Sequence, residues 1–222
     1  MPWCIRAGSN TTEKTMRAQW LPFFPLSRFA PVARSSGSAD SRTTVLLQDL
    51  KESNTPHDEN IEMGAMIEVP AVAHVLDQVL PYVDFVSVGT NDLVQYLLAV
   101  DRDNPRVADI YDPYQPAVLR VLKHIAMVGN HANKPVAICG EIAGDHYFTP
   151  LLMGLGYREL SMAPVFLPRV KLMVRSFTIA EAESITEEAL KLSTAAEIRE
   201  LATARSRAAW SGFLNEAGSD RA

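Results

Sequence analysis

Residues 84–100, DFVSVGTNDLVQYLLAV, pass from a β-strand into an α-helix within one short stretch. The apolar run over 84–89 predicts a strand, and the spacing of apolar residues over 92–100 predicts a helix. Three further runs have the same strand-like character, at 64–68, 135–139 and 159–162. Because helical patterns separate these strands, the sequence predicts parallel βα units. The helices are expected at 71–80, 92–100, 116–132, 147–156, 166–176, 180–192 and 195–209.

The composition is that of an ordinary soluble globular protein, with 47% hydrophobic and 21% charged residues among 222. The net charge of −5 argues against a general nucleic-acid binder, because such proteins carry basic surfaces. No uncharged apolar run approaches the roughly 20 residues that span a bilayer. The two cysteines, Cys4 and Cys139, are far apart in the sequence, which favours a reducing cytoplasm over a disulfide framework.

The first 44 residues differ from the rest of the chain. Residues 1–40 contain five basic side chains against two acidic ones, and Pro, Ser and Gly interrupt any regular period. Three interpretations stay open: a targeting sequence, a disordered extension, or a non-native start to a truncated reading frame. We expect residues 1–44 to be poorly structured or non-native, residues 45–210 to form the main domain, and residues 211–222 to be a flexible tail.

Polar residues follow the predicted strands at the points where the strands end. The first strand ends in Glu68, the second in GTND at 89–92, the third in CGE at 139–141 and the fourth near Ser161. In a parallel α/β sheet or barrel, functional residues gather where strands end and loops begin. Parallel neighbours would bring these four ends to one mouth, so we expect a functional site there.

Glu68 and Asp92 are natural candidates for a metal pair at this mouth. Mg²⁺ prefers oxygen ligands and often takes one or two protein carboxylates together with substrate oxygens and water. Each residue also has a simpler interpretation: Glu68 could pair with a nearby arginine, and Asp92 could cap the helix that starts at Leu93. The spacing by itself leaves both interpretations open.

Two further residues have chemistry that suits this mouth. Arg102, which follows the helix over 92–100, is either a clamp for a phosphate or carboxylate or a solvated charge beside Asp101 and Asp103. Cys139 ends a strand and could donate or accept a proton, since a free thiol has a pKa near about 8.5. The alternative for Cys139 is a small buried hydrophobe, as most free cysteines are.

Three stretches, taken together and in order, resemble the phosphoenolpyruvate-utilising enzymes. They are GAMIEVP at 64–70, DFVSVGTNDLVQY at 84–96 with LAVDR at 98–102, and CGEIAGD at 139–145. The likeness is strongest to phosphoenolpyruvate–protein phosphotransferase, enzyme I of the sugar phosphotransferase system, and the run DNPRVAD at 103–109 resembles its nitrogen-related variant. The resemblance covers about residues 45–200.

The resemblance implies a fold and a set of residue roles. The corresponding domain of that family is a (β/α)8 TIM barrel that binds phosphoenolpyruvate and Mg²⁺ and makes the homodimer contact. Glu68 and Asp92 match its metal ligands, and Asn91 and Asp92 match its substrate-contacting pair. Arg102 matches a phosphate-binding arginine, and Cys139 matches the acid–base residue that delivers a proton to the enolpyruvate carbon.

The implied reaction is phosphoryl transfer from phosphoenolpyruvate to a histidine of the enzyme and on to a phosphocarrier protein, with release of pyruvate. About four βα units follow Val45, where a closed barrel has eight, so we expect the C-terminal half of the barrel. The resemblance does not extend to the family's histidine domain, its carrier-docking domain or two further substrate-binding arginines. We therefore expect no complete phosphotransfer by this chain alone.

Two other interpretations of the chain stay open. One is a non-catalytic fragment that acts as a dimerising or regulatory partner. The other is a fragment of pyruvate phosphate dikinase or phosphoenolpyruvate synthase, which share the barrel and its chemistry. The short segments between the motifs favour enzyme I.

Overall fold

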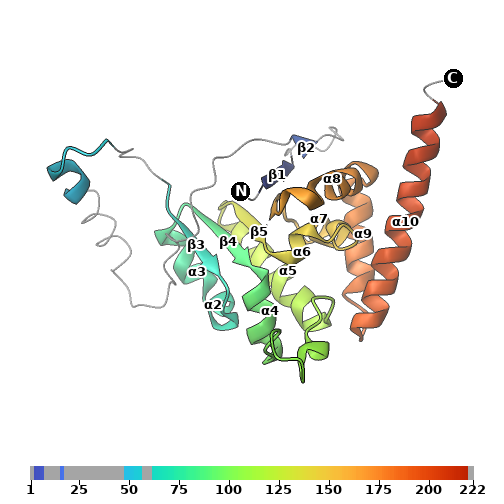
Figure 1. Cartoon of the computed structure of the whole chain (residues 1–222), viewed down its shortest axis with the longest axis horizontal. Helices are drawn as coiled ribbons and strands as arrows, with labels where there is room; N and C mark the ends of the chain where they lie inside the picture. The colour runs from blue at the N-terminus through green and yellow to red at the C-terminus, as the bar shows by residue number, and fades with distance from the viewer. Residues whose placement is uncertain (1–2, 8–15, 18–47, 57–61, 220–222) are drawn as a thin grey trace.

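The computed structural model describes residues 3–7, 16–17, 48–56 and 62–219 of the chain. Its central element is a six-stranded sheet with the strand order β2-β1-β6-β5-β4-β3 (Figure 1). The strands are β1 (Trp3–Ala7), β2 (Met16–Arg17), β3 (Gly64–Ile67), β4 (Phe85–Gly89), β5 (Val136–Cys139) and β6 (Glu159–Met162). Strands β3 to β6 are mutually parallel, which confirms the mixed α/β class and all four predicted strands.

The register of the parallel strands aligns their carboxyl ends. Ile67 of β3 is opposite Val88 of β4, and Gly89 of β4 is opposite Cys139 of β5. Cys139 in turn is opposite Ser161 of β6. The residues that follow these positions therefore meet at one edge of the sheet.

The two faces of the parallel sheet differ in chemistry, because side chains alternate along each strand. One face carries apolar side chains that are buried in the hydrophobic core: Ala65, Ile67, Val86, Val88, Val136, Ile138, Leu160 and Met162. The other face carries small, polar or sulfur-containing side chains: Met66, Ser87, Ala137, Cys139, Glu159 and Ser161. The contribution of the sheet to the apolar core therefore comes from one face.

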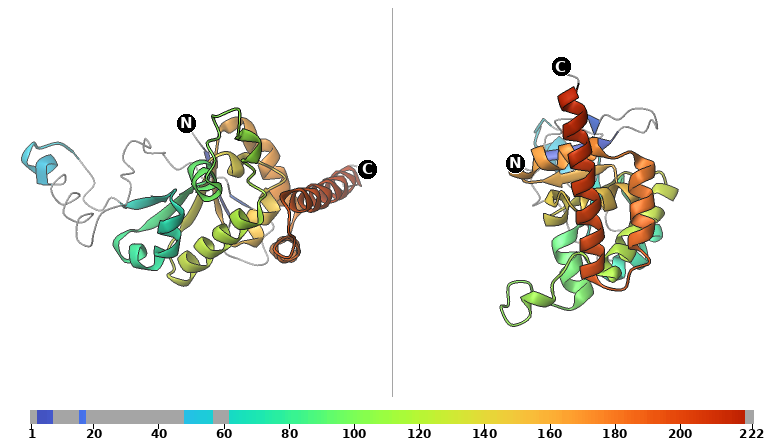
Figure 2. Two further views of the ribbon diagram at one scale, coloured as in Figure 1. Left: turned by 90° about the horizontal axis from the view of Figure 1, so that it is seen from below. Right: turned by 90° about the vertical axis from the view of Figure 1, so that its right-hand side faces the viewer.

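Helices connect the parallel strands and extend beyond the last one. They are α2 (Pro70–His74), α3 (Leu76–Val79), α4 (Thr90–Leu98), α5 (Pro116–His131), α6 (Glu141–Gly144), α7 (Thr149–Gly154), α8 (Leu167–Ser176), α9 (Ile179–Ala189) and α10 (Ala195–Ser219), with 3-10 helices η2 (Leu80–Tyr82), η3 (Ala108–Ile110) and η4 (Pro164–Phe166). The longest, α10, packs against α8 and α9 and forms one side of the molecule (Figures 1 and 2).

The single helix predicted over 71–80 is wrong. The structure has α2 and α3 there instead, followed by η2. The break lies at Val75, whose φ of −120° and ψ of 22° leave the helical region. Ala73, Leu76 and Leu80 are nevertheless all buried, so the apolar spacing continues across the break and conceals it in the sequence.

Near the N-terminus, the structure describes only the strands β1 and β2 of the predicted segment 1–44. β1 pairs antiparallel with the outer edge of β6, and β2 pairs antiparallel with β1. The predicted boundary at residues 44–45 lies outside the described residues. Helix α10 continues through Ser219, beyond the end predicted at 209, although residues 210–219 contain two glycines and few strong helix formers. In the described part of the chain, no helix combines the length and apolar character that a membrane crossing needs.

Candidate functional site

A cleft of about 320 Å³ opens at the carboxyl ends of the parallel strands. Four of the five predicted site residues lie in its wall: Glu68, Asn91, Asp92 and Cys139. The other lining residues are Met66, Gly89, Thr90, Gly140, Glu141, Ser161, Met162, Ala163 and Phe166. Arg102, the fifth predicted residue, is outside this lining and forms an ion pair with Glu141. A larger hollow of about 550 Å³ lies along α10 and contains none of the predicted site residues.

The turn from β4 into α4 brings a carboxylate across a glycine. Helix α4 begins at Thr90, directly after Gly89, so Asp92 lies in its first turn. A Cβ atom at Gly89 would lie 2.6 Å from Cγ and 2.8 Å from Oε1 of Glu68. The missing side chain at Gly89 therefore lets Glu68 lie beside the helix turn that contains Asp92.

These contacts bear on the simpler interpretations of the two carboxylates. Gly89 is the N-cap of α4, and the helix has no side-chain cap hydrogen bond, so Asp92 does not cap it. Among the residues that the structure describes, Glu68 forms no ion pair with an arginine. Neither of the simpler interpretations therefore accounts for these two carboxylates in the cleft.

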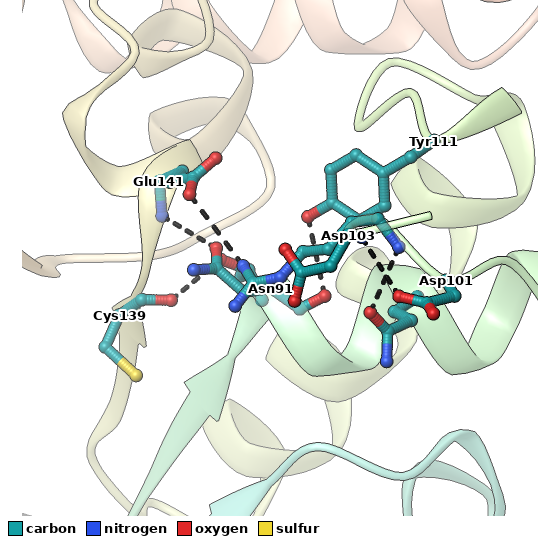
Figure 3. Close-up of polar contacts among 9 residues, drawn as sticks. Asn91, Asp101, Asp103, Tyr111, Cys139 and Glu141 are labelled. Atoms are coloured by element: carbon teal, nitrogen blue, oxygen red, sulfur yellow. Dashed lines mark hydrogen bonds and ion pairs between the residues drawn. The ribbon is translucent and has the colours of Figure 1, made fainter. Parts of the chain in front are cut away.

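A second turn, from β5 into α6, closes against α4 through Gly140. Gly140 has a φ of 107°, a left-handed conformation that favours glycine. Thr90 Oγ1 donates a hydrogen bond of 2.7 Å to the carbonyl oxygen of Cys139. The amide of Glu141 donates a hydrogen bond of 3.0 Å to Asn91 Oδ1 (Figure 3). These two bonds hold the start of α4 against the strand end that carries Cys139.

Arg102 approaches the cleft from the loop that follows α4. Its backbone amide donates a hydrogen bond of 3.3 Å to Gln95 Oε1, which ties this loop to the helix. Its guanidinium group lies 3.8 Å from the carboxylate of Glu141. The hydroxyl of Tyr111 donates a hydrogen bond of 3.4 Å to the carbonyl oxygen of Asn91 (Figure 3). Burial, and then repulsion from Glu141, raises the pKa of Tyr111, whereas the nearby positive charge of Arg102 lowers it.

The electrostatics of the cleft raise the pKa of two groups. Partial burial, and then repulsion from Asp92, raises the pKa of Glu68. Burial is the largest cause of the raised pKa of the Cys139 thiol; a hydrogen bond with Ser87 lowers that pKa, and the charges of Glu68 and Asp92 raise it. At neutral pH Cys139 is therefore a protonated thiol, and its Sγ donates a hydrogen bond of 3.2 Å to the carbonyl oxygen of Val88.

A known family of enzymes matches most of the described domain. The family described as "PEP-utilising enzyme, PEP-binding domain", where PEP is phosphoenolpyruvate, matches residues 37–179. The chain belongs to the PEP-utilising enzymes. The matched span contains every residue that lines the cleft, together with Arg102 and Tyr111.

Curated relatives of this PEP-utilising chain are similar over the same domain. The phosphoenolpyruvate-protein phosphotransferase of Listeria monocytogenes serovar 1/2a is 43% identical over 152 residues, which cover 68% of this chain and 27% of that protein. The protein of the same name from Buchnera aphidicola subsp. Acyrthosiphon pisum is 41% identical, with the same two coverages. Multiphosphoryl transfer protein 1 of Escherichia coli K12 is 42% identical over 70% of this chain and 19% of its own length. The chain thus spans about a quarter or less of these relatives.

Some contacts in this PEP-utilising domain were not predicted from the sequence. Thr90 and Gly140 lie within the strand ends that the pattern selected, yet nothing in the spacing shows that they lock two turns together. Tyr111 carries no signal at all, because it follows η3 in a loop. Only the folding of that loop against α4 brings Tyr111 to Asn91 and Arg102.

Proposed function

We propose that this chain forms the phosphoenolpyruvate-binding part of a phosphoenolpyruvate–protein phosphotransferase. Such an enzyme transfers the phosphoryl group of phosphoenolpyruvate to one of its own histidines and then to a phosphocarrier protein, releasing pyruvate. The observation that carries the proposal is the cleft, whose wall combines Glu68, Asn91, Asp92 and Cys139. The name of two relatives, phosphoenolpyruvate-protein phosphotransferase, supports the same substrate.

The proposal extends to the architecture of the complete enzyme. Strands β3 to β6 would be the last four strands of a (β/α)8 barrel, because they are parallel, are separated by helices and carry the cleft at their carboxyl ends. The sheet face that carries Met66, Ser87 and Cys139 would then face the barrel interior. We expect this enzyme to be a cytoplasmic homodimer with no nucleic-acid or membrane partner.

Mg²⁺ is the cofactor that the donor set suits. Glu68 and Asp92 have no ion-pair partner among the described residues, whereas Glu141 pairs with Arg102. Repulsion from Asp92 contributes to the raised pKa of Glu68, and a cation held by both carboxylates would offset this repulsion. The described residues contain no cluster of three or more His, Cys, Asp or Glu side chains suited to a metal, so we assign the remaining positions to substrate and water. When bound, the ion supplies positive charge to the phosphoryl and enolate oxygens.

The other residues of the site have distinct tasks in this proposal. Arg102 offsets the negative charge of the phosphoryl group, because positioning and electrostatics dominate phosphoryl transfer. When the bond between phosphorus and the enolpyruvate oxygen breaks, its electron pair stays on that oxygen, and the enolate accepts a proton at its methylene carbon. Cys139 supplies this proton, since its raised pKa keeps the thiol protonated at neutral pH.

Calorimetry with oxalate, a mimic of enolpyruvate, tests the binding site. We expect the chain to bind oxalate only when Mg²⁺ is present, and Asp92→Asn to abolish this binding because it removes one metal ligand. Asp109→Asn is the matched control, since Asp109 is exposed, lies outside the cleft lining and carries the same charge. Oxalate binding that needs no Mg²⁺, or that survives Asp92→Asn unchanged, would contradict the metal assignment.

Proton exchange tests the role of Cys139. With Mg²⁺ in D2O, the chain should exchange the methyl protons of pyruvate, because enolisation is the reverse of the proposed protonation. Cys139→Ala should lose this exchange, followed by NMR, and keep its affinity for oxalate. Exchange at the same rate in the variant would remove Cys139 from the mechanism. Among the residues that the structure describes, no histidine lines the cleft, so transfer to a phosphocarrier by this chain alone is not expected, and observing it would contradict the proposal.

A further inference from the structure

Arg102 lies between two side chains whose roles the proposed reaction does not yet use. Glu141 lies 3.8 Å from the guanidinium group, and the hydroxyl of Tyr111 interacts electrostatically with the same guanidinium group. Both neighbours are also joined to Asn91 of the cleft wall, Glu141 through its backbone amide and Tyr111 through its hydroxyl. The position of Arg102 is therefore coupled to a residue that faces the ligand.

The two neighbouring side chains differ in how strongly water weakens their interaction with Arg102. The hydroxyl of Tyr111 donates its one proton to the Asn91 carbonyl oxygen, so its oxygen keeps its lone pairs and favours the positive charge of the nearby Arg102. Tyr111 is half-buried, so this contact has little competition from water. The contact to Glu141 is longer than a hydrogen bond, and the Glu141 side chain is 73% exposed, so water screens it.

The backbone and side chain of Glu141 also differ in freedom. Its amide donates a hydrogen bond of 3.0 Å to Asn91 Oδ1, whereas its carboxylate forms an ion pair with Arg102 alone in the described part of the chain. The carboxylate can therefore leave Arg102 by rotating into water without moving the turn at Gly140. A phosphoryl group carries more negative charge than a carboxylate and binds a guanidinium group more strongly.

We propose that Glu141 and Tyr111 are positioning residues for Arg102: Glu141 holds the guanidinium group in the ligand-free cleft and yields it to an incoming phosphoryl group, while Tyr111 keeps its contact throughout. This inference rests on the proposed function, because it names the phosphoryl group of phosphoenolpyruvate as the competing anion. Glu141 thus opposes binding slightly, and Tyr111 favours it. A purely structural role would give losses for both.

Calorimetric titration of the chain in Mg²⁺ with two ligands tests the inference. Phosphoenolpyruvate contains the phosphoryl group, and oxalate lacks it. We expect Glu141→Gln to tighten phosphoenolpyruvate binding about two- to fivefold, the range of an exposed ion pair. Tyr111→Phe should weaken it about three- to tenfold, as expected for one lost hydrogen bond. Neither substitution should change the affinity for oxalate by as much as twofold.

Asp103→Asn is the matched control for charge, because Asp103 is exposed on the same loop as Arg102 and lies outside the cleft lining. A tightening that Asp103→Asn reproduces, or one that includes oxalate, would come from the general field and would overturn the inference. Weaker phosphoenolpyruvate binding in Glu141→Gln would also overturn the inference, because a substitution at this exposed side chain should not unfold the chain. If the unaltered chain binds neither ligand, the proposed function fails and the inference fails with it; if it binds both, only the responses of the variants decide.

Discussion

Gly140→Ala is the substitution that tests the construction of the cleft most directly. Gly140 combines a φ of 107° with a ψ of −167°, a region of backbone conformation that is almost exclusive to glycine. A Cβ atom there would also lie 2.5 Å from Thr90 Oγ1 and 2.8 Å from Asn91 Oδ1. Both oxygens are already engaged in the hydrogen bonds that join the two turns of the cleft. Alanine therefore strains the backbone and displaces two bonded side chains at once.

The magnitude follows from these two effects. The backbone strain costs about 1–3 kcal/mol, and each displaced hydrogen bond costs about 0.5–1.5 kcal/mol. We expect Gly140→Ala to lower the free energy of unfolding by about 2–6 kcal/mol. Gly156→Ala is the matched control, because Gly156 has a φ of 101° and its added Cβ would meet only the terminal amide nitrogen of Asn130, at 2.9 Å. The control should lose only about 1–2 kcal/mol, the cost of a left-handed alanine.

Urea denaturation of both variants gives the two free energies, and calorimetry with oxalate and Mg²⁺ gives the effect on the cleft. Gly140→Ala should weaken oxalate binding by more than about tenfold, because Asn91 must move. A misplaced contact of this kind costs about 1.4 kcal/mol or more of binding free energy, which corresponds to that factor. Gly156→Ala should bind oxalate as the unaltered chain does. Equal losses of stability in the two variants, or unchanged oxalate binding in Gly140→Ala, would refute the reasoning about this turn.

Three further substitutions test separate parts of the structure. Glu68→Gln should raise the thermal unfolding midpoint of the metal-free chain at pH 7, because the raised pKa of Glu68 means that its ionised form destabilises the folded state. This gain should vanish below the ordinary carboxyl pKa of 4.5, where the side chain is protonated in both states. Mg²⁺ should no longer raise the unfolding midpoint of the variant. Ser206→Ala should leave the free energy of unfolding, measured by urea denaturation, unchanged or raise it by up to about 1 kcal/mol. The reason is that Ser206 Oγ is buried with no hydrogen-bond partner in the described part of the chain. A clear loss of stability would show that the hydroxyl is hydrogen bonded. His146→Gln should reduce the loss of unfolding free energy as the pH falls below 6.5. Burial lowers the pKa of His146 in the folded state, so below that pH the unfolded state binds a proton that the folded state does not, and the folded state loses stability. An unchanged pH profile of the variant would contradict this.

Much of this arrangement could be predicted from the sequence. Each parallel strand begins and ends within one residue of its predicted bounds, because a short apolar run flanked by polar or glycine residues has few other structures open to it. The strand-end rule also selected residues that the fold brings to one cleft, among them Glu68, Asn91 and Cys139. Their roles in binding and catalysis remain predictions that the experiments above test.

The rest depends on contacts that a single sequence does not encode locally. The break at Val75 is invisible because α2 and α3 bury the same side, so the apolar period does not change there. Tyr111 is in a loop, and no period or spacing links it to Arg102, nine residues earlier in the chain. Loops follow from tertiary contacts more than from propensity, which is why the surroundings of Arg102 appear only in the structure.

Adjacent residues of β5 show how the fold separates stability from chemistry. Ile138 has no exposed surface and lies in the core, whereas its neighbour Cys139 points to the opposite face and lines the cleft. Because side chains alternate along a strand, neighbours in sequence belong to different environments. We expect Ile138→Ala to lower the free energy of unfolding by about 2–5 kcal/mol in urea denaturation, through the cavity it opens. Cys139→Ala removes a smaller group from the rim of an existing cleft.

The loss for Cys139→Ala should therefore be below about 1.5 kcal/mol, although this variant is the one that should lose proton exchange with pyruvate. Comparable losses of stability at both positions would mean that the Cys139 face is packed as tightly as the core. The alternation argument would then fail for this sheet. If the two losses separate as expected, the side on which a strand residue points, rather than its place in the sequence, determines whether it supports the fold or the reaction.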